Sequence, residues 1–183
     1  MTSAPTPANI PAISGSTIAD LVASGAAALT AAGVAFGHGT ATAEDEAAWL
    51  TLWKLGLPLD SELAPGAPES LADQAVSAQQ QAEVAELFAE RIRTRKPAAY
   101  LTREAWLQGV PFYIDERAIV PRSFIAELLA DGSVDGFLSE NTRQVLDLCT
   151  GNGSLAVLAA VAWPEVEVTG ADISADALAV AHI

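Results

Sequence analysis

The sequence predicts an α/β chain with a small helical domain, a β-hairpin linker and the first βαβ part of a larger sheet domain. Three observations predict it: apolar residues recur at helical spacing in the first half, bulky β-favouring residues follow Pro97, and a strand–glycine turn–helix–strand pattern begins at Gln144. The 183 residues are 51% hydrophobic, which is enough for one sizeable core or two small ones.

The first part of the chain reads as a leader followed by helices. Residues 1–16 contain Pro5, Pro7 and Pro11 and no apolar period, so we expect a flexible leader. Residues 17–96 are expected to form the helical domain. Its predicted helices begin after Thr17 and end at Gly33, span 44–55, and span 70–94, and Thr17 with Asp20 resembles a capping box.

The second part of the chain is expected to be mixed. Residues 97–132 predict a β-hairpin interrupted at Gly109 and a short linker helix over 124–130. Residues 133–183 predict a strand at 144–148, a helix at 154–162, a strand ending at Asp172 and the start of a further helix capped by Ser174. These elements form a βαβ unit with a right-handed crossover.

The charge is distributed unevenly. The net charge is −14, yet seven of the nine basic residues lie within positions 91–122. The cluster Arg91, Arg93, Arg95 and Lys96 therefore predicts either a contact with RNA phosphates or the ordinary stabilisation of a helix C-terminus by cations. The uncharged run 21–43 is too rich in Ala, Gly, Ser and Thr for a membrane span, and the first 53 residues lack Lys and Arg. With a single cysteine, these features favour a cytoplasmic protein.

The glycine-rich turn after the predicted strand indicates a ligand site. Such a turn aims backbone N–H groups and a positive helix end at a ligand beyond the strand's carboxyl edge. Gly151 permits a backbone angle that side chains disfavour, and Gly153 lets the chain approach a ligand without a Cβ. Asp172, 19 positions after Gly153, is placed to accept hydrogen bonds from two ribose hydroxyls. These residues predict an adenosine-containing cofactor.

Asp147 separates two classes of cofactor. Gly151, Gly153 and Ala156 also fit the spacing of a dinucleotide site, which keeps nicotinamide and flavin cofactors open. An acidic residue just before the turn repels a pyrophosphate but suits the ammonium group of S-adenosylmethionine, so Asp147 favours the methyl donor. Its structural alternative is a carboxylate that braces the loop. Cys149 is expected to be a small packed residue, and the isolated histidines give no metal site.

Several segments together resemble the protein-glutamine N-methyltransferase family. The order and spacing of the matching segments agree throughout, over about residues 17–183. Three further segments resemble the branch that acts on ribosomal protein L-three rather than the branch that acts on release factors. The family segments are 97–102, 112–117, 120–123 and 147–154, and the branch segments are 37–40, 45–47 and 57–60.

This resemblance implies a function for each part of the chain. Residues 17–96 would recognise the substrate, 97–132 would be the hairpin and linker helix, and 133–183 would begin a Rossmann-like S-adenosylmethionine-dependent methyltransferase domain. The implied reaction is methyl transfer to a glutamine side-chain amide of a ribosomal protein. The implied cofactor-binding residues are Asp147, Thr150, Gly151, Asn152, Gly153, Ser154 and Asp172.

One family feature is missing from the sequence. An Asn-Pro-Pro-Tyr motif grips the glutamine amide in this family, and the 183 residues do not contain it. A primary amide is a poor nucleophile that needs such groups to orient it. We therefore expect no catalytic residue here, an inactive chain, and a partial sheet with uncovered apolar faces. The open alternatives are a release-factor glutamine methyltransferase, a dinucleotide-binding oxidoreductase fragment and a non-catalytic ribosome-binding module.

Overall fold

The computed structural model describes residues 10–183, and the chain divides into two compact units, Met1–Thr102 and Arg103–Ile183. Most of the predicted leader, residues 1–9, lies outside the described part. Ile10 and Ile13, from its remaining part, pack against the core of the first unit.

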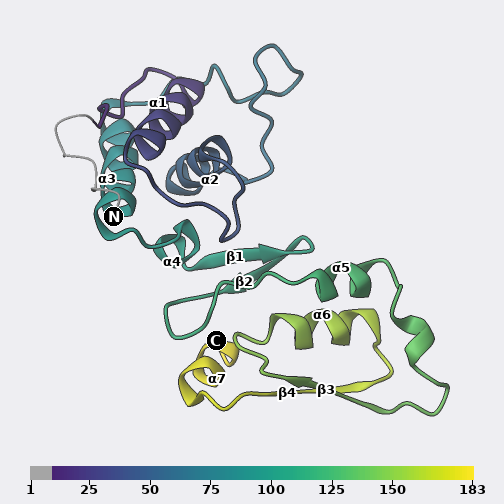
Figure 1. Ribbon diagram of the computed structural model, residues 1–183. Helices are drawn as coiled ribbons and strands as arrows, with labels where there is room; N and C mark the ends of the chain where they lie inside the picture. Colours follow the sequence, from purple (N-terminus) through teal and green to yellow (C-terminus); the bar gives the residue numbers. More distant parts are fainter. Residues whose placement is uncertain (1–9) are drawn as a thin grey trace. The chain divides into compact units, whose positions relative to one another are not determined.

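The first unit is helical, as predicted (Figure 1). Its helices are α1 (Ile18–Ala31), α2 (Ala43–Leu55), α3 (Ala78–Thr94) and α4 (Ala98–Thr102). Reciprocal side-chain and backbone hydrogen bonds form capping boxes at the starts of α1, α2 and α3, which satisfy N–H groups that a helix cannot pair internally. The short helix α4 was not predicted.

The third helix begins later than the sequence predicts. We expected a helix over 70–94, but Ser77 caps α3 and the preceding segment forms turns. The carbonyls of Gln74 and Ala72 accept the first N–H groups of α1, from Ile18 and Ala19, at 3.1 and 3.0 Å. The segment before α3 is therefore used to complete the start of α1, which competes with helix formation there.

The core of the first unit lies between α1, α2 and α3. Leu21, Leu29, Leu50 and Phe88 are fully buried in one cluster. A methyl group on Gly25 would lie 2.4 Å from the Phe88 ring, so the glycine lets α3 approach α1 closely. The three helices thus share one apolar interior.

A buried ion pair joins α2 to α3. Arg91 and Glu46 are each almost inaccessible, and Arg91 Nε donates to Glu46 Oε1 at 2.7 Å. Arg91 also donates to the Ala35 carbonyl at 3.0 Å, and Thr40 donates its hydroxyl hydrogen to Glu46 Oε2 at 3.0 Å. Both charges are compensated, and the loop between α1 and α2 is held in place by them.

These contacts correct the predicted RNA contact at Arg91. Its guanidinium is buried in the first unit, so it has no surface from which to reach a phosphate. Arg93 is exposed and pairs with Glu90, and Arg95 donates to the Ala32 carbonyl at 2.8 Å. Arg91, Arg93 and Arg95 of the basic cluster thus bind neighbouring backbone and carboxylate groups of the same unit.

The second unit contains the predicted hairpin and βαβ pattern. Its elements are β1 (Glu104–Leu107), β2 (Val110–Tyr113), α5 (Phe124–Ala130), the 3-10 helix η2 (Asp135–Phe137), β3 (Gln144–Leu148), α6 (Ser154–Ala162), β4 (Glu167–Ala171) and α7 (Ala175–Ala181). Strands β1 and β2 pair antiparallel around a turn at Gln108 and Gly109, both with positive φ. Strands β3 and β4 pair in parallel, with Asp147 opposite Gly170.

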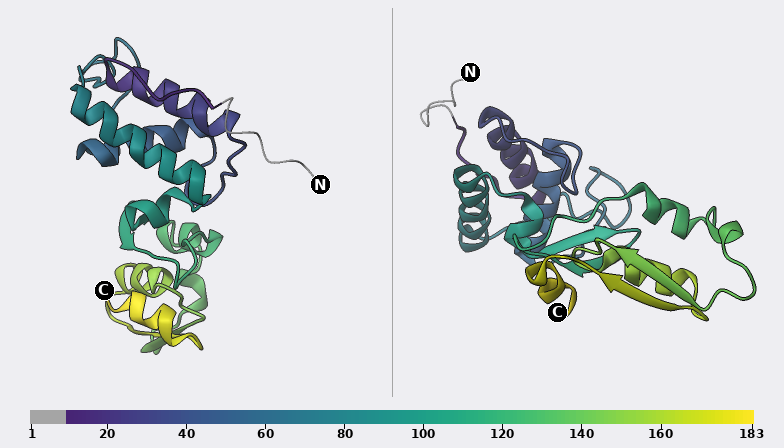
Figure 2. Two further views of the ribbon diagram at one scale, coloured as in Figure 1. Left: turned by 90° about the vertical axis from the view of Figure 1, so that its left-hand side faces the viewer. Right: turned by 60° about the horizontal axis from the view of Figure 1, so that its bottom comes forward.

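One face of the β3–β4 pair is covered and the other is not. Helix α6 lies across one face (Figure 2), and Leu158 and Ala159 pack against Ala126 and Leu129 of α5. On the opposite face of β3, Leu146 and Leu148 are 61% and 71% exposed. The expected uncovered apolar face is therefore present. Within residues 10–183, none of the helices combines the length and apolar character needed to cross a bilayer.

Substitution of Arg91 by Met should destabilise the first unit by about 3 kcal/mol, because it leaves the Glu46 charge buried without a partner. Chemical denaturation followed by the helical circular dichroism signal measures this loss. Arg93→Met removes the same charge from an exposed pair and should cost less than about 1 kcal/mol. Equal losses for the two variants would contradict a structural role specific to Arg91.

Candidate functional site

The predicted glycine turn and Asp172 meet at one edge of the sheet. Strands β3 and β4 run parallel, so their carboxyl ends lie side by side, and the turn follows β3 while Asp172 follows β4. The N–H of Thr150 donates to the Ala171 carbonyl at 3.0 Å, which extends the contact between the strands into the turn. Ligands of open parallel sheets bind at this carboxyl edge.

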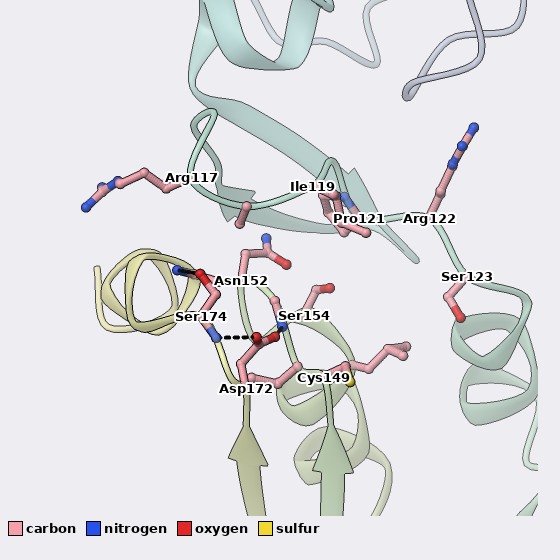
Figure 3. A pocket seen from close by; sticks show the side chains of 15 residues that line it. Arg117, Ile119, Pro121, Arg122, Ser123, Cys149, Asn152, Ser154, Asp172 and Ser174 are labelled. Atoms are coloured by element: carbon pink, nitrogen blue, oxygen red, sulfur yellow. Dashed lines mark hydrogen bonds between the residues drawn. The ribbon is translucent and has the colours of Figure 1, made fainter.

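The Asp172 carboxylate joins the turn to the start of α7. Its Oδ1 accepts the Ser174 N–H and its Oδ2 accepts the Gly151 N–H, both at 2.9 Å (Figure 3). These two hydrogen bonds, the one from Ser174 first, hold the pKa of Asp172 below its ordinary value of 3.8. The carboxylate is therefore ionised at neutral pH, and its stabilising effect is lost only as the pH falls through this lowered pKa.

The Asp147 side chain stabilises the turn by a hydrogen bond with Thr150. Its Oδ2 accepts the hydroxyl hydrogen of Thr150 at 2.6 Å, and Thr150 is buried. A methyl group on Gly170 would lie 2.8 Å from the Thr150 hydroxyl oxygen, so this position accommodates Thr150 by having no side chain. The arrangement agrees with the loop-bracing alternative for Asp147.

Glycine is favoured at positions 151 and 153 of the turn for different structural reasons. Gly151 has φ +59 with open space where a Cβ would project, so its backbone angle alone favours glycine. Gly153 has φ +81, and a Cβ there would lie 3.3 Å from the Cβ of Ala181 in α7. The prediction that Gly153 clears space for a ligand is therefore replaced by packing against α7. Cys149, expected to be packed, is exposed at φ 63.

A cavity of about 340 Å³ lies at this edge of the sheet, a volume suited to a small cofactor. Five of the seven predicted cofactor-binding residues line it: Thr150, Gly151, Asn152, Ser154 and Asp172. Asp147 and Gly153 are not among its lining residues. The structure thus brings the turn and the second acidic residue together around one space, with Asp147 behind the turn.

The sequence did not predict that the opposite wall of the cavity belongs to the site. It is the segment after β2, which contributes Ala118, Ile119 and Pro121 as apolar lining residues. The family resemblance covered this segment, but its pattern carried no recognisable chemistry. Figure 3 shows the Arg117 and Arg122 side chains directed away from Asp172.

Arg117 is held by its neighbour in the same segment. It donates from Nη2 to Asp115 Oδ2 at 2.6 Å and from Nε to Oδ1 at 2.9 Å. The Arg117 guanidinium keeps the pKa of Asp115 far below its usual range. The pair therefore shapes the cavity wall through its backbone, rather than presenting a free cation to a ligand.

The chemistry of this cavity suits an adenosine cofactor that has no pyrophosphate. It combines an ionised carboxylate, polar residues of the turn and apolar wall residues. The carboxylate can accept ribose hydroxyls, and the adjacent Asp147 adds negative charge that disfavours a pyrophosphate. Among residues 10–183, no group of three His, Cys, Asp or Glu side chains is arranged to hold a metal ion.

Comparisons with known proteins agree with this chemistry. Residues 130–183 match the family model "Methyltransferase small domain". The chain is 48% identical over 185 residues to a protein of Burkholderia pseudomallei, 44% identical over 166 residues to one of Bordetella pertussis, and 41% identical over 172 residues to one of Bradyrhizobium diazoefficiens. Each relative is named "Ribosomal protein uL3 glutamine methyltransferase".

The matches cover this chain much more completely than they cover the relatives. They extend over 100%, 90% and 90% of this chain but over 56%, 54% and 52% of the three relatives. The chain therefore spans about half the length of the curated relatives that it matches. The comparisons confirm the resemblance to the protein-glutamine N-methyltransferases, in the uL3 branch, and do not favour the release-factor, oxidoreductase or non-catalytic alternatives.

Substitution of Gly153 by Ala should destabilise the second unit by about 1–2 kcal/mol, because a side chain is disfavoured at φ +81 and meets Ala181. Thermal unfolding followed by tryptophan fluorescence measures the change. Gly136→Ala is the matched control, since that glycine has open space and no positive φ. A Gly153 variant as stable as the Gly136 variant would show that neither constraint matters.

Proposed function

We propose that this chain, a relative of the protein-glutamine N-methyltransferases, supplies the S-adenosylmethionine site of an enzyme that methylates a glutamine side-chain amide in ribosomal protein uL3. The observation that carries the proposal is the Asp172 carboxylate, ionised at the cavity and joined to the glycine turn through Gly151 N–H. The names of the relatives support the substrate class.

Asp172 is proposed to bind the cofactor's ribose. Each of its oxygens accepts one backbone N–H, from Ser174 or Gly151, and a carboxylate oxygen can accept two hydrogen bonds. These bonds leave acceptor capacity on the carboxylate for ribose hydroxyls. The existing bonds fix the orientation of the carboxylate before the cofactor arrives, which reduces the cost of binding.

Asp147 is proposed to select the cofactor by charge rather than by lining the cavity. Its carboxylate lies directly behind the turn and binds Thr150. Negative charge there favours the cationic amino-acid end of S-adenosylmethionine over a pyrophosphate. When bound, S-adenosylmethionine supplies the electrophilic methyl group, while the turn and Asp172 hold its adenosine end.

The first unit is proposed to recognise the ribosomal protein. Arg93, Arg95 and Lys96 are exposed whereas Arg91 is buried, so the ribosomal RNA contact is proposed for the three exposed residues of the predicted basic cluster. A ribosomal protein substrate also fits a cytoplasmic location. Release factors and nicotinamide dinucleotides are the substrates and ligands that this proposal excludes.

We further infer that residues 1–183 bind the cofactor without transferring its methyl group. The segment contains no Asn-Pro-Pro-Tyr sequence to hold the glutamine amide. An amide nitrogen that is not oriented toward the methyl group reacts poorly, because its lone pair is delocalised into the carbonyl. Binding and transfer are therefore separable for this chain.

Asp172→Asn should weaken S-adenosylmethionine binding by about tenfold or more, because the neutral amide offers one acceptor atom in place of two charged ones. Isothermal titration calorimetry at neutral pH measures the affinity. Asp176→Asn makes the same change at an exposed position of α7 and should leave the affinity within about twofold. Tighter binding of a nicotinamide dinucleotide than of S-adenosylmethionine would refute the proposal.

Incubation of the 183-residue chain with purified uL3 and radiolabelled S-adenosylmethionine should give no methyl incorporation above the background without enzyme. Scintillation counting of the precipitated uL3 measures it. The full-length Burkholderia pseudomallei relative serves as the positive control for the assay. Stoichiometric methylation of a uL3 glutamine by the 183-residue chain would show that transfer does not need the missing tetrapeptide.

A further inference from the structure

Asn152 of the glycine turn contacts the end of β2, just before the opposite wall of the cavity. Its side chain is 8% exposed, and its Nδ2 donates to the backbone carbonyl of Tyr113 at 3.3 Å. Figure 3 shows the side chain extending from the turn toward the segment that carries Ile119. The hydrogen bond therefore connects the turn to the end of β2, 39 positions away, from which the chain continues into the opposite wall of the cavity.

Tyr113 is a suitable point at which to fix that wall. It is the last residue of β2, and the wall residues follow it within a few positions. Its hydroxyl donates to Asp115 Oδ2 at 3.0 Å, and Asp115 in turn accepts from Arg117. Ile114, between them, is fully buried. These local contacts connect residues 113–117 to one another. A hydrogen bond that restrains Tyr113 therefore also restrains the residues that follow it.

We propose that Asn152 is a positioning residue that sets the distance between the glycine turn and the wall beginning at Tyr113, and thereby the width of the cofactor cavity. The inference rests on the proposed cofactor function. It differs from the expectation that Asn152 binds the cofactor directly, because it assigns to the side chain the hydrogen bond with Tyr113, which uses one of the two Nδ2 hydrogens. A site held at the correct width before binding loses less entropy when its ligand arrives.

The two roles for Asn152 differ in the absence of cofactor. A positioning residue restrains residues 114–121 in the empty protein, whereas a direct ligand does not. Asn152→Asp keeps the shape but removes the donor at neutral pH, and Asn152→Ala removes it without adding charge. Asn141→Asp is the matched control, since Asn141 is exposed in the loop before β3.

Hydrogen exchange measured by mass spectrometry on the 183-residue chain without cofactor tests the restraint. Both Asn152 variants should exchange the amides of residues 114–120 about tenfold faster than the wild type, and Asn141→Asp should not. S-Adenosylmethionine affinity by calorimetry should fall about fivefold in both Asn152 variants. Far-UV circular dichroism confirms that each variant is folded.

Each outcome decides between the hypotheses. Unchanged exchange at residues 114–120 in Asn152→Ala overturns the positioning role, even if affinity falls, because that pattern indicates a direct ligand. Faster exchange with unchanged affinity also overturns it, since the restraint would then not matter to the cavity. Failure of the wild type to bind S-adenosylmethionine instead refutes the proposed cofactor function, while the exchange comparison still reports on the hydrogen bond.

Discussion

The candidate site depends on one carboxylate that is shared between two strand ends. Parallel pairing of β3 and β4 brings the turn and Asp172 to the same edge, but pairing alone does not fix the turn's shape. Hydrogen bonds from Gly151 and Ser174 to Asp172 do so, and they also keep the carboxylate charged. Because the same oxygens face the cavity, the group that organises the turn is also the group best placed to bind a ribose.

Asp147 and Asp172, two of the acidic residues of the βαβ unit, differ in their contacts because they occupy different positions relative to the strands. Asp147 lies within β3, on the face toward α6, where Thr150 uses its oxygen and Gly170 leaves room for Thr150. Asp172 lies beyond β4, where it reaches the cavity. Position along the strand thus separates the two residues. A residue inside a strand can stabilise the sheet, whereas a residue beyond the strand's end can contact a ligand.

The sequence predicted what local rules determine and missed what distant contacts determine. Capping residues such as Thr17, and the glycine turn, mark their elements through neighbours a few positions away. The delayed start of α3 depends on hydrogen bonds from its preceding segment to α1, and the burial of Arg91 depends on Glu46, 45 positions away. The wall after β2 likewise joins the site only through tertiary packing, which no short motif records.

The distribution of the site along the chain explains how cofactor binding can be separate from catalysis. Every cavity-lining residue falls within positions 117–177, inside a single compact unit, so the proposed cofactor site is assembled there. The uncovered face of β3, with Leu146 and Leu148, is on the side of the sheet opposite α6. Orienting a glutamine amide requires acceptor groups in addition to the turn and Asp172. A Rossmann-like sheet therefore permits tight control of the cofactor by its first strands, with the acceptor amide controlled elsewhere.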